Sequence, residues 1–151
     1  MKFKSYNSYY RKNLDILCTM LGFVNADVFD IAKPFIPENL EIIGPPDTNK
    51  NQVNCHAYTF EKDDWYAVEN VEDLIVNKEL IEVEKPQIEN VIIYYLRDSK
   101  PLPIIKHTGI YLGNGKVRSK WACGPVFRHD VFNVPYSYGE IIKFFKPGGD
   151  R

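Results

Sequence analysis

Apolar residues near the start of the chain recur at the spacing of an amphipathic helix. Within residues 8–21 they stand three or four positions apart, at Tyr10, Leu14, Leu17 and Leu21. This spacing places the four side chains on one face of a helix. Gly22 follows directly and is a residue type that commonly ends helices. The pattern predicts a helix over residues 8–21.

The middle of the chain mixes turn-forming and helical segments. The stretch 34–47 is polar and rich in proline, so we expect no regular element there. Residues 54–60 are expected to form one or two helical turns. Asn70 is a suitable N-cap for a further helix with its apolar residues at Val71, Leu74, Ile75 and Leu80.

The second half of the chain has the pattern of an antiparallel sheet. Segments rich in β-branched and aromatic residues are expected to form strands over 91–96, 104–112, 116–121 and 141–145. Between the second and third of these, Gly113, Asn114 and Gly115 tolerate the positive φ that a tight hairpin requires. Helices followed by an antiparallel sheet of about four to six strands predict an α+β domain.

Length and charge narrow the class of protein. The chain has 151 residues, of which 44% are hydrophobic, and its formal net charge is −1. This length suits a single domain over residues 1–151, and the apolar content is too high for a disordered chain. The near-neutral charge offers no electrostatic basis for binding nucleic acid or an acidic membrane.

No segment has the features of a membrane span or an export signal. The sequence contains no uninterrupted apolar stretch long enough to cross a bilayer. Its charged N-terminus is followed by neither an apolar core nor a small-residue cleavage site. We therefore expect a cytoplasmic protein with no membrane span, unless a non-classical secretion route delivers it elsewhere.

The cysteines and histidines do not form a metal-binding pattern. Cys18, Cys55 and Cys123 are scattered, and no CxxC pair occurs, which argues against a disulfide scaffold or a zinc site. Cys18 lies on the apolar face of the predicted first helix and is assigned to packing, and Cys123 to a loop or strand end. We expect no metal and no organic cofactor.

Cys55 and His107 are the candidates for nucleophilic catalysis. Cys55 begins an apolar segment after a turn-rich stretch, so it is expected near a helix N-terminus, where backbone N–H groups favour the thiolate. His107 begins a strand and is the candidate proton acceptor. His56 is expected to face elsewhere, because consecutive helical residues point about 100° apart. The alternative for both Cys55 and His107 is a purely structural role, which is common for buried cysteine.

Three segments resemble the papain-like hydrolases of the NlpC/P60 and CHAP superfamily. They are Asn54-Cys55-His56-Ala57-Tyr58, residues 90–95, and the predicted hairpin over residues 107–117. The hairpin, which begins His-Thr-Gly-Ile-Tyr-Leu-Gly-Asn-Gly, matches the family pattern H-x-G-I-Y-x-G-N-G nearly letter for letter. In that family a cysteine opens a helix, and a histidine on a strand follows in a short meander.

A bacterial branch of the superfamily shows further similarity. Its members have an N-C-x-A motif, a tryptophan downstream (Trp65 here) and an S-K-x-G segment followed by histidine; the corresponding region here covers residues 119–129. The resemblance implies a papain-like fold, with N-terminal helices packed on an antiparallel sheet. It implies a catalytic core over about residues 50–146, preceded by a helical or irregular extension over about residues 1–45.

Two residues are candidates for orienting the histidine. The family's orienting residue stands on the strand after the hairpin, where it is usually His, Asn, Gln or Asp. The matching position here is Ser119. A serine hydroxyl can accept a hydrogen bond from Nδ1–H, but its short side chain must approach closely. His129, on the segment that follows, is the alternative third member.

The resemblance implies a thiol-dependent amide-bond hydrolase, that is, a cysteine peptidase or amidase. In this interpretation Cys55 attacks as thiolate, His107 transfers the proton, Ser119 or His129 orients His107, and the Cys55 N–H serves the oxyanion. The substrate is then a peptide or other amide. Family analogy suggests peptidoglycan peptides, while a delivered toxin or effector, with an immunity or regulatory protein as partner, fits equally well. The alternatives are an intracellular deamidase or acyltransferase, and a catalytically inactive binding module, which the serine at position 119 favours.

Overall fold

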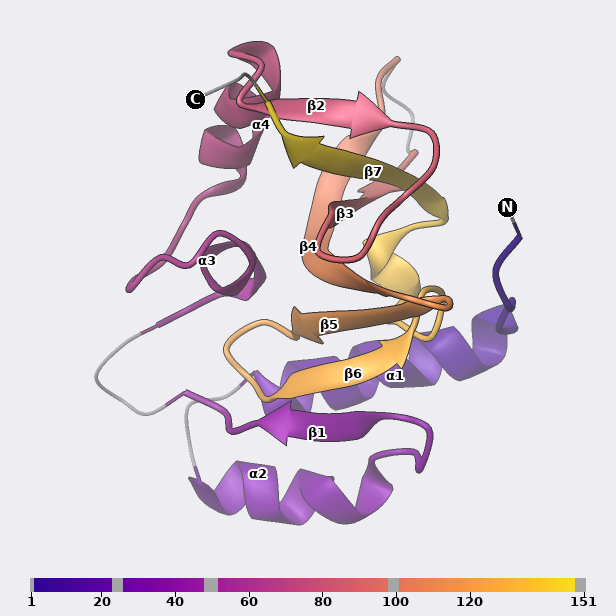
Figure 1. Ribbon diagram of the computed structural model, residues 1–151. Helices are drawn as coiled ribbons and strands as arrows, with labels where there is room; N and C mark the ends of the chain where they lie inside the picture. Colours follow the sequence, from indigo (N-terminus) through magenta and orange to yellow (C-terminus); the bar gives the residue numbers. More distant parts are fainter. Residues whose placement is uncertain (1, 23–25, 48–51, 98–100, 149–151) are drawn as a thin grey trace.

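The chain forms an α+β structure built on an antiparallel sheet (Figure 1). The computed structural model describes residues 2–22, 26–47, 52–97 and 101–148. The helices are α1 (Ser8–Leu21), α2 (Ala26–Ala32), η1 (Lys33–Phe35), α3 (Cys55–Thr59), α4 (Val68–Val76) and η2 (Tyr136–Tyr138), where η denotes a 3-10 helix. The strands are β1 (Glu41–Gly44), β2 (Leu80–Val83), β3 (Val91–Leu96), β4 (Ile104–Gly113), β5 (Lys116–Lys120), β6 (Val126–Asp130) and β7 (Ile141–Pro147). The predicted α+β class is confirmed.

The strands of the described residues form one seven-stranded sheet in the order β1-β6-β5-β4-β3-β7-β2. Neighbouring strands pair antiparallel throughout. The sequence predicts four to six strands; the short strands β1, β2 and β6 were not expected and account for the larger sheet. The β4–β5 hairpin turns where the sequence predicts, at Gly113, Asn114 and Gly115, with φ angles of 86°, 53° and 75°.

Alternate residues of β3 face two separate hydrophobic cores. Ile92 and Tyr94 belong to the core that contains Leu14 of α1, whereas Ile93 belongs to the core that contains Val71 of α4. Because successive side chains of a strand point to opposite faces, the sheet forms a layer between α1 and α4. Figure 1 shows α1 passing behind β5 and β6, with α3 and α4 grouped on another side of the sheet.

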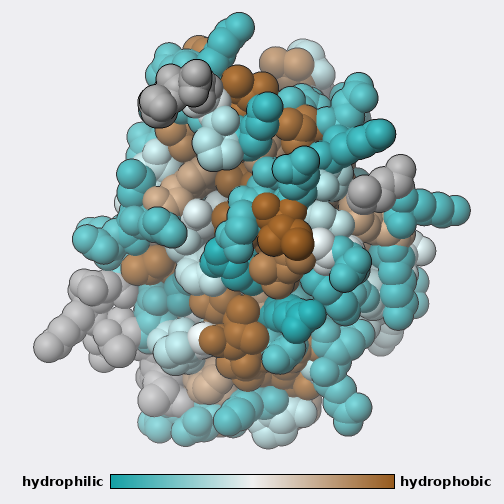
Figure 2. All heavy atoms as spheres, viewed as in Figure 1, coloured by the Kyte–Doolittle hydropathy of each residue, from teal (hydrophilic) through white to brown (hydrophobic). Residues whose placement is uncertain are grey.

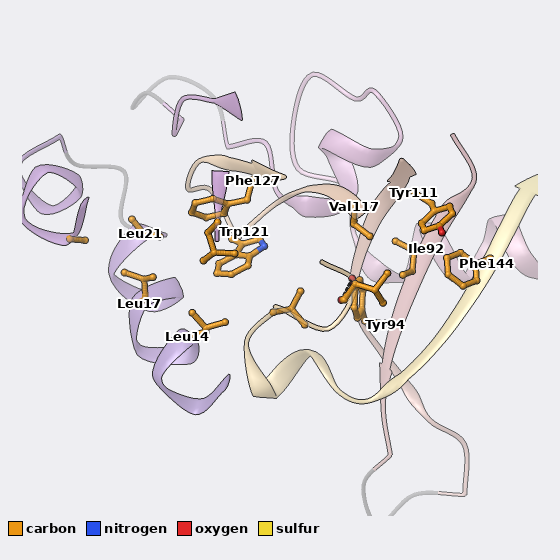
Figure 3. Close-up of a cluster of buried hydrophobic side chains, with 14 residues drawn as sticks. Leu14, Leu17, Leu21, Ile92, Tyr94, Tyr111, Val117, Trp121, Phe127 and Phe144 are labelled. Atoms are coloured by element: carbon orange, nitrogen blue, oxygen red, sulfur yellow. Dashed lines mark hydrogen bonds between the residues drawn. The ribbon is translucent and has the colours of Figure 1, made fainter. Parts of the chain in front are cut away.

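Trp121 lies in the core on the α1 side. It is fully buried, and its ring centroid is 4.6 Å from that of Phe127. Figure 3 shows both rings beside α1, which directs the side chains of Leu14, Leu17 and Leu21 toward the sheet. Burying a leucine side chain contributes about 1.5–3 kcal/mol, so these contacts hold α1 firmly against the sheet.

The expectation that residues 34–47 lack regular structure is wrong. This stretch contains most of η1 and the whole of β1. β1 pairs with β6 through Glu41↔Arg128 and Ile42↔Phe127. It is an edge strand, and edge strands tolerate nearby proline because only one side is hydrogen-bonded. β1 lies in the predicted extension and β6 in the predicted core, so the two regions share the sheet.

The helix predicted after Asn70 has other boundaries. α4 begins at Val68, with Ala67 as its N-cap, and ends at Val76. Lys78 has a φ of 61°, and this left-handed conformation turns the chain out of the helix. The sequence pattern predicts Leu80 in the helix, whereas it is the first residue of β2 and pairs with Pro147.

The surface is predominantly hydrophilic on the face shown in Figure 2, where hydrophobic residues occur in small groups between polar ones. None of the helices in the described ranges has both the length and the apolar character needed to span a bilayer.

Candidate functional site

Cys55 is the first residue of α3, within the segment for which the sequence predicts helical turns. The N-cap is Asn54, whose Oδ1 accepts hydrogen bonds from the backbone N–H of Ala57 (3.1 Å) and of Tyr66 (3.0 Å). Its Nδ2 donates to the carbonyl oxygen of Tyr66 at 2.8 Å. Asn54 is buried. These bonds join the start of α3 to the segment before α4 and so fix the position of Cys55.

The Cys55 thiol is buried against the backbone of β4. Burial raises the pKa of Cys55 to about 12, although the backbone N–H groups of Thr108 and His56 that face the sulfur act in the opposite direction. The sequence interpretation expects a lowered thiol pKa. In the structure the thiol pKa is raised instead, because removal of the sulfur from water outweighs the stabilisation of the thiolate by these N–H groups.

His56 contacts Cys55 instead of facing elsewhere. Its Nδ1 is 3.7 Å from Cys55 Sγ and 2.8 Å from Thr108 Oγ1. The separation of about 100° between consecutive helical residues applies to their Cβ directions, and the imidazole is long enough to bring Nδ1 back toward the sulfur. The expectation that His56 faces away from Cys55 is therefore wrong.

A chain of hydroxyl groups determines which His56 nitrogen carries the proton. Thr59 Oγ1 donates to the Cys55 carbonyl oxygen at 2.8 Å, because a carbonyl can only accept. Thr59 Oγ1 therefore accepts from Thr108 Oγ1 at 3.1 Å, and Thr108 Oγ1 accepts from His56 Nδ1. Because Nδ1 carries a proton, it can donate to the Cys55 sulfur but cannot accept the thiol proton.

Thr108 and His107 lie on opposite faces of β4. Thr108 contacts α3, whereas His107 pairs across the strands with Tyr94, which belongs to the core on the α1 side. The His107 ring is fully buried. It stacks on the ring of Tyr138, with centroids 4.1 Å apart and an interplanar angle of 11°, and lies 5.4 Å from the ring of Tyr94.

Both ring nitrogens of His107 lack a hydrogen-bond partner among the described residues. Among these residues, His107 therefore forms no hydrogen bond to the Cys55 thiol. The sulfur lies instead at the backbone N–H of the next residue, Thr108. Burial lowers the pKa of His107 well below 6.5, and repulsion by His129 and His56 acts in the same direction. His107 is thus neutral at physiological pH, with one nitrogen able to accept a proton.

Ser119 and His129, the two candidates for the orienting residue, are bonded to each other. His129 Nδ1 donates to the carbonyl oxygen of Asp130 at 2.7 Å. Burial lowers the pKa of His129 to about 4, so the ring is neutral and Nε2 accepts from Ser119 Oγ at 2.7 Å. The Ser119 hydroxyl proton is thereby used by His129. Neither residue forms a hydrogen bond to His107 among the described residues.

The sequence interpretation missed Thr59, Thr108 and Tyr138. The spacing of Cys55 and Thr59 gives a signal for the first, because a threonine hydroxyl reaches the carbonyl four residues earlier in a helix. No local pattern identifies Tyr138, which reaches His107 from the separate turn η2.

A surface hollow of about 330 Å³ adjoins Tyr138 on the α1 side. Its lining includes Asp15 and Cys18 of α1, Ser137 of η2, and Ala122 from the loop between β5 and β6. Tyr138, whose ring stacks on His107, is thus one of the residues that line this hollow. Within the described ranges, no group of three or more His, Cys, Asp or Glu side chains is arranged to hold a metal ion.

Iodoacetamide labelling measures the protonation state of Cys55. With a thiol pKa raised to about 12, the thiolate is a very small fraction at neutral pH. We expect slow labelling of the native protein at pH 7 and a roughly tenfold faster rate for each pH unit above it. The rate is followed by mass spectrometry between pH 6 and pH 9.

The control for this labelling is the protein unfolded in urea, whose thiols have an ordinary pKa near about 8.5. Cys18, whose pKa burial raises to about 11, is expected to share the pH dependence of Cys55 in the native protein. Fast labelling of Cys55 alone near pH 6–7 contradicts this description of the thiol.

Comparisons with protein-family models, with curated proteins and with solved structures give no match.

Proposed function

We propose that the protein is a thiol-dependent amide-bond hydrolase with a papain-like arrangement, in which Cys55 is the nucleophile and His107 the general base. The observation that carries the proposal is the placement of the two residues. The Cys55 sulfur lies at the backbone N–H of Thr108 and also interacts electrostatically with Tyr138, the residue whose ring stacks on His107. His107 is buried, neutral and without a hydrogen-bond partner among the described residues. Catalytic hydrogen bonds are often long or poorly aligned until substrate binds.

The protonation states favour attack by a neutral pair. Because the thiol pKa is raised and the imidazole pKa is lowered, the resting state is thiol and neutral imidazole. The C–S bond to the carbonyl carbon forms while the thiol proton moves to an unprotonated nitrogen of His107, and the carbonyl π electrons move to oxygen. His107 then protonates the leaving nitrogen as the C–N bond breaks, which leaves a thioester on Cys55.

Water completes the reaction. His107 accepts a proton from a water molecule that attacks the thioester carbonyl, and the C–S bond then breaks with return of a proton to the sulfur. His56 has its Nδ1 proton directed at Thr108 and the sulfur, so it stabilises negative charge on sulfur and takes no part as the base.

The substrate we propose is a peptide amide, either in a peptidoglycan peptide or in the target of a delivered toxin or effector. The test incubates the protein with peptidoglycan fragments and with a peptide library, and detects newly formed amines by mass spectrometry. Cleavage that disappears in Cys55→Ala and persists in Cys18→Ala supports the proposal. Transfer of the acyl group to an added amine, or release of ammonia from glutamine side chains, assigns the same site to an acyltransferase or a deamidase.

The pH profile distinguishes a neutral pair from a thiolate–imidazolium pair. His107 must be unprotonated to act as base, and its pKa lies well below 6.5, so the acid limb of kcat/KM is expected well below pH 6.5. Deprotonation of Cys55 begins only toward its pKa of about 12, so we expect no alkaline limb below about pH 9. A bell-shaped profile that falls between pH 7 and pH 9 contradicts the neutral pair.

A binding module without catalysis is the second candidate function. The observation that favours it is the burial of Cys55 and His107, with no hydrogen bond between them. If the protein is such a module, some peptides of the panel bind and are recovered uncleaved, and Cys55→Ala yields no change in the recovered peptides.

A further inference from the structure

The ring of His107 is positioned by stacking, because no hydrogen bond restrains either nitrogen among the described residues. Tyr138 covers one face of the imidazole almost parallel to it, at 4.1 Å and 11°. Tyr94 meets the imidazole at a tilt of 50°. The nearly parallel contact with Tyr138 therefore does most to set the plane in which the His107 nitrogens lie.

Helix α1 holds the segment 134–139, which carries Tyr138. Arg11 donates to the carbonyl oxygens at both ends of the segment, those of Val134 (3.0 Å), Pro135 (3.2 Å) and Gly139 (2.7 Å). Arg11 is buried, so its guanidinium is committed to these bonds.

The middle of the same segment is held by the next two turns of α1. Asp15 accepts hydrogen bonds from the Ser137 backbone N–H (3.2 and 3.3 Å to its two oxygens) and from Ser137 Oγ (2.5 Å). Cys18 Sγ is 3.3 Å from Tyr138 Oη. Arg11, Asp15 and Cys18 are spaced by four and three residues, so they share one face of α1.

The other side of the segment is pressed against β3. Gly139 has a φ of 92°, and a Cβ atom there would stand 2.0 Å from the carbonyl oxygen of Tyr95. Tyr138 is therefore confined between α1 and the sheet, which leaves its ring little freedom to move away from His107.

We propose that Tyr138 is the positioning residue for His107, and that α1 is part of the site because Arg11 and Asp15 hold the segment that carries Tyr138 in place. The proposal rests on the proposed function in that His107 is the base. It gives the N-terminal helix a role that the sequence interpretation left unassigned. It also replaces a hydrogen-bonded orienting residue, since the hydroxyl proton of Ser119 is already donated to His129.

The experiment compares Tyr138→Leu and Tyr138→Phe with the matched control Tyr136→Leu. Tyr136 belongs to the same turn η2, but its ring lies over the charged groups of Arg11 and Lys12 (5.8 and 5.0 Å). Tyr138→Leu removes the stacked ring, Tyr138→Phe keeps it, and Tyr136→Leu makes the same chemical change away from His107. Circular dichroism establishes that each variant is folded.

The first readout is the NMR titration of the His107 ring, whose signal is assigned by its loss in His107→Gln. The titratable groups around His107 are His129, His56, Tyr94 and Tyr138. Burial lowers the pKa of the two histidines and raises the pKa of the two tyrosines, so all four are neutral near pH 7. We expect the wild type, Tyr138→Phe and Tyr136→Leu to show no titration of His107 between pH 5 and pH 8. In Tyr138→Leu the His107 pKa is expected to rise by at least about one unit, because the ring gains access to water.

The second readout is the rate of amide hydrolysis. Tyr138→Leu is expected to lower kcat at least about tenfold with little change in KM, because the base is misoriented while substrate contacts remain. Tyr138→Phe is expected to stay near the wild type. An unchanged His107 titration in folded Tyr138→Leu, or an equal change in Tyr136→Leu, overturns the proposal.

The two proposals fail in different ways. If no amide is cleaved, the proposed function fails, and the His107 titration still decides whether Tyr138 positions the ring. If Tyr138→Leu does not fold, Asp15→Ala replaces it, since it removes every hydrogen bond from Asp15 to the backbone N–H and the hydroxyl of Ser137, the residue next to Tyr138. A His107 titration unchanged in folded Asp15→Ala overturns the proposal.

Discussion

Cys55→Ala is expected to abolish amide hydrolysis, and His107→Gln to lower kcat by at least about 10³-fold, because both steps of the proposed reaction require the thiol and an unprotonated imidazole. Glutamine is chosen because the His107 ring is fully buried, and alanine would leave a cavity there. The rates are measured on whichever peptide amide the substrate panel identifies.

The matched control is His56→Gln. His56 contacts Cys55 directly, with Nδ1 3.7 Å from the sulfur. Its Nδ1 proton is nevertheless fixed by the hydroxyl chain that ends at the Cys55 carbonyl. We therefore expect His56→Gln to reduce the rate less than about tenfold. A loss as large as that of His107→Gln, in a folded variant, contradicts the choice of base.

The elements that the sequence predicts correctly carry their signal locally. α1 matches the predicted bounds because its apolar period and the following Gly22 lie within the helix and at its end. The β4–β5 hairpin matches because Gly113, Asn114 and Gly115 supply the positive φ angles that the turn needs. Neither prediction requires knowledge of distant parts of the chain.

The missed strands depend on partners that are distant in sequence. β6, with the sequence Val-Phe-Arg-His-Asp, has no sustained alternation of apolar and polar residues. It is a strand because it pairs with β5 on one side and with β1 on the other, for example through Ser119↔Phe127 and Ile42↔Phe127. β1 and β2 have four residues each and lie at the two edges of the sheet. Such short segments give too little pattern for a sequence to identify them.

In the candidate site, too, some features have a local sequence signal and others depend on distant parts of the chain. The motif positions place Cys55 at the start of α3 and His107 on β4, as the sequence predicts. The protonation states are not accessible from the motif, because they depend on burial by segments far along the chain. Tyr138 covers His107 from η2, and Cys18 of α1 contacts Tyr138. The sequence thus indicates the candidate residues and the elements that carry them, whereas packing determines their pKa values.

Arg11 is the residue of α1 whose replacement is expected to cost the most stability. Its side chain is 3% exposed and donates to three backbone carbonyls, of Val134, Pro135 and Gly139. A buried carbonyl that loses its donor costs about 1–3 kcal/mol. Its ion pair with Glu140 contributes little by comparison, because the two charged groups are 3.8 Å apart and Glu140 is 73% exposed.

Arg11→Met is therefore expected to lower the free energy of unfolding by about 3–5 kcal/mol, measured by urea denaturation with an unchanged m value. Methionine keeps much of the aliphatic packing, so the loss reports the hydrogen bonds to the carbonyls. Lys12→Met removes the same charge from the next, exposed position of α1 and is expected to change stability by less than about 0.5 kcal/mol. Glu140→Gln is expected to have a similarly small effect, which separates the ion pair from the carbonyl contacts. If Arg11→Met is no more destabilising than Lys12→Met, the bonds from α1 to the segment 134–139 do not hold that segment in place.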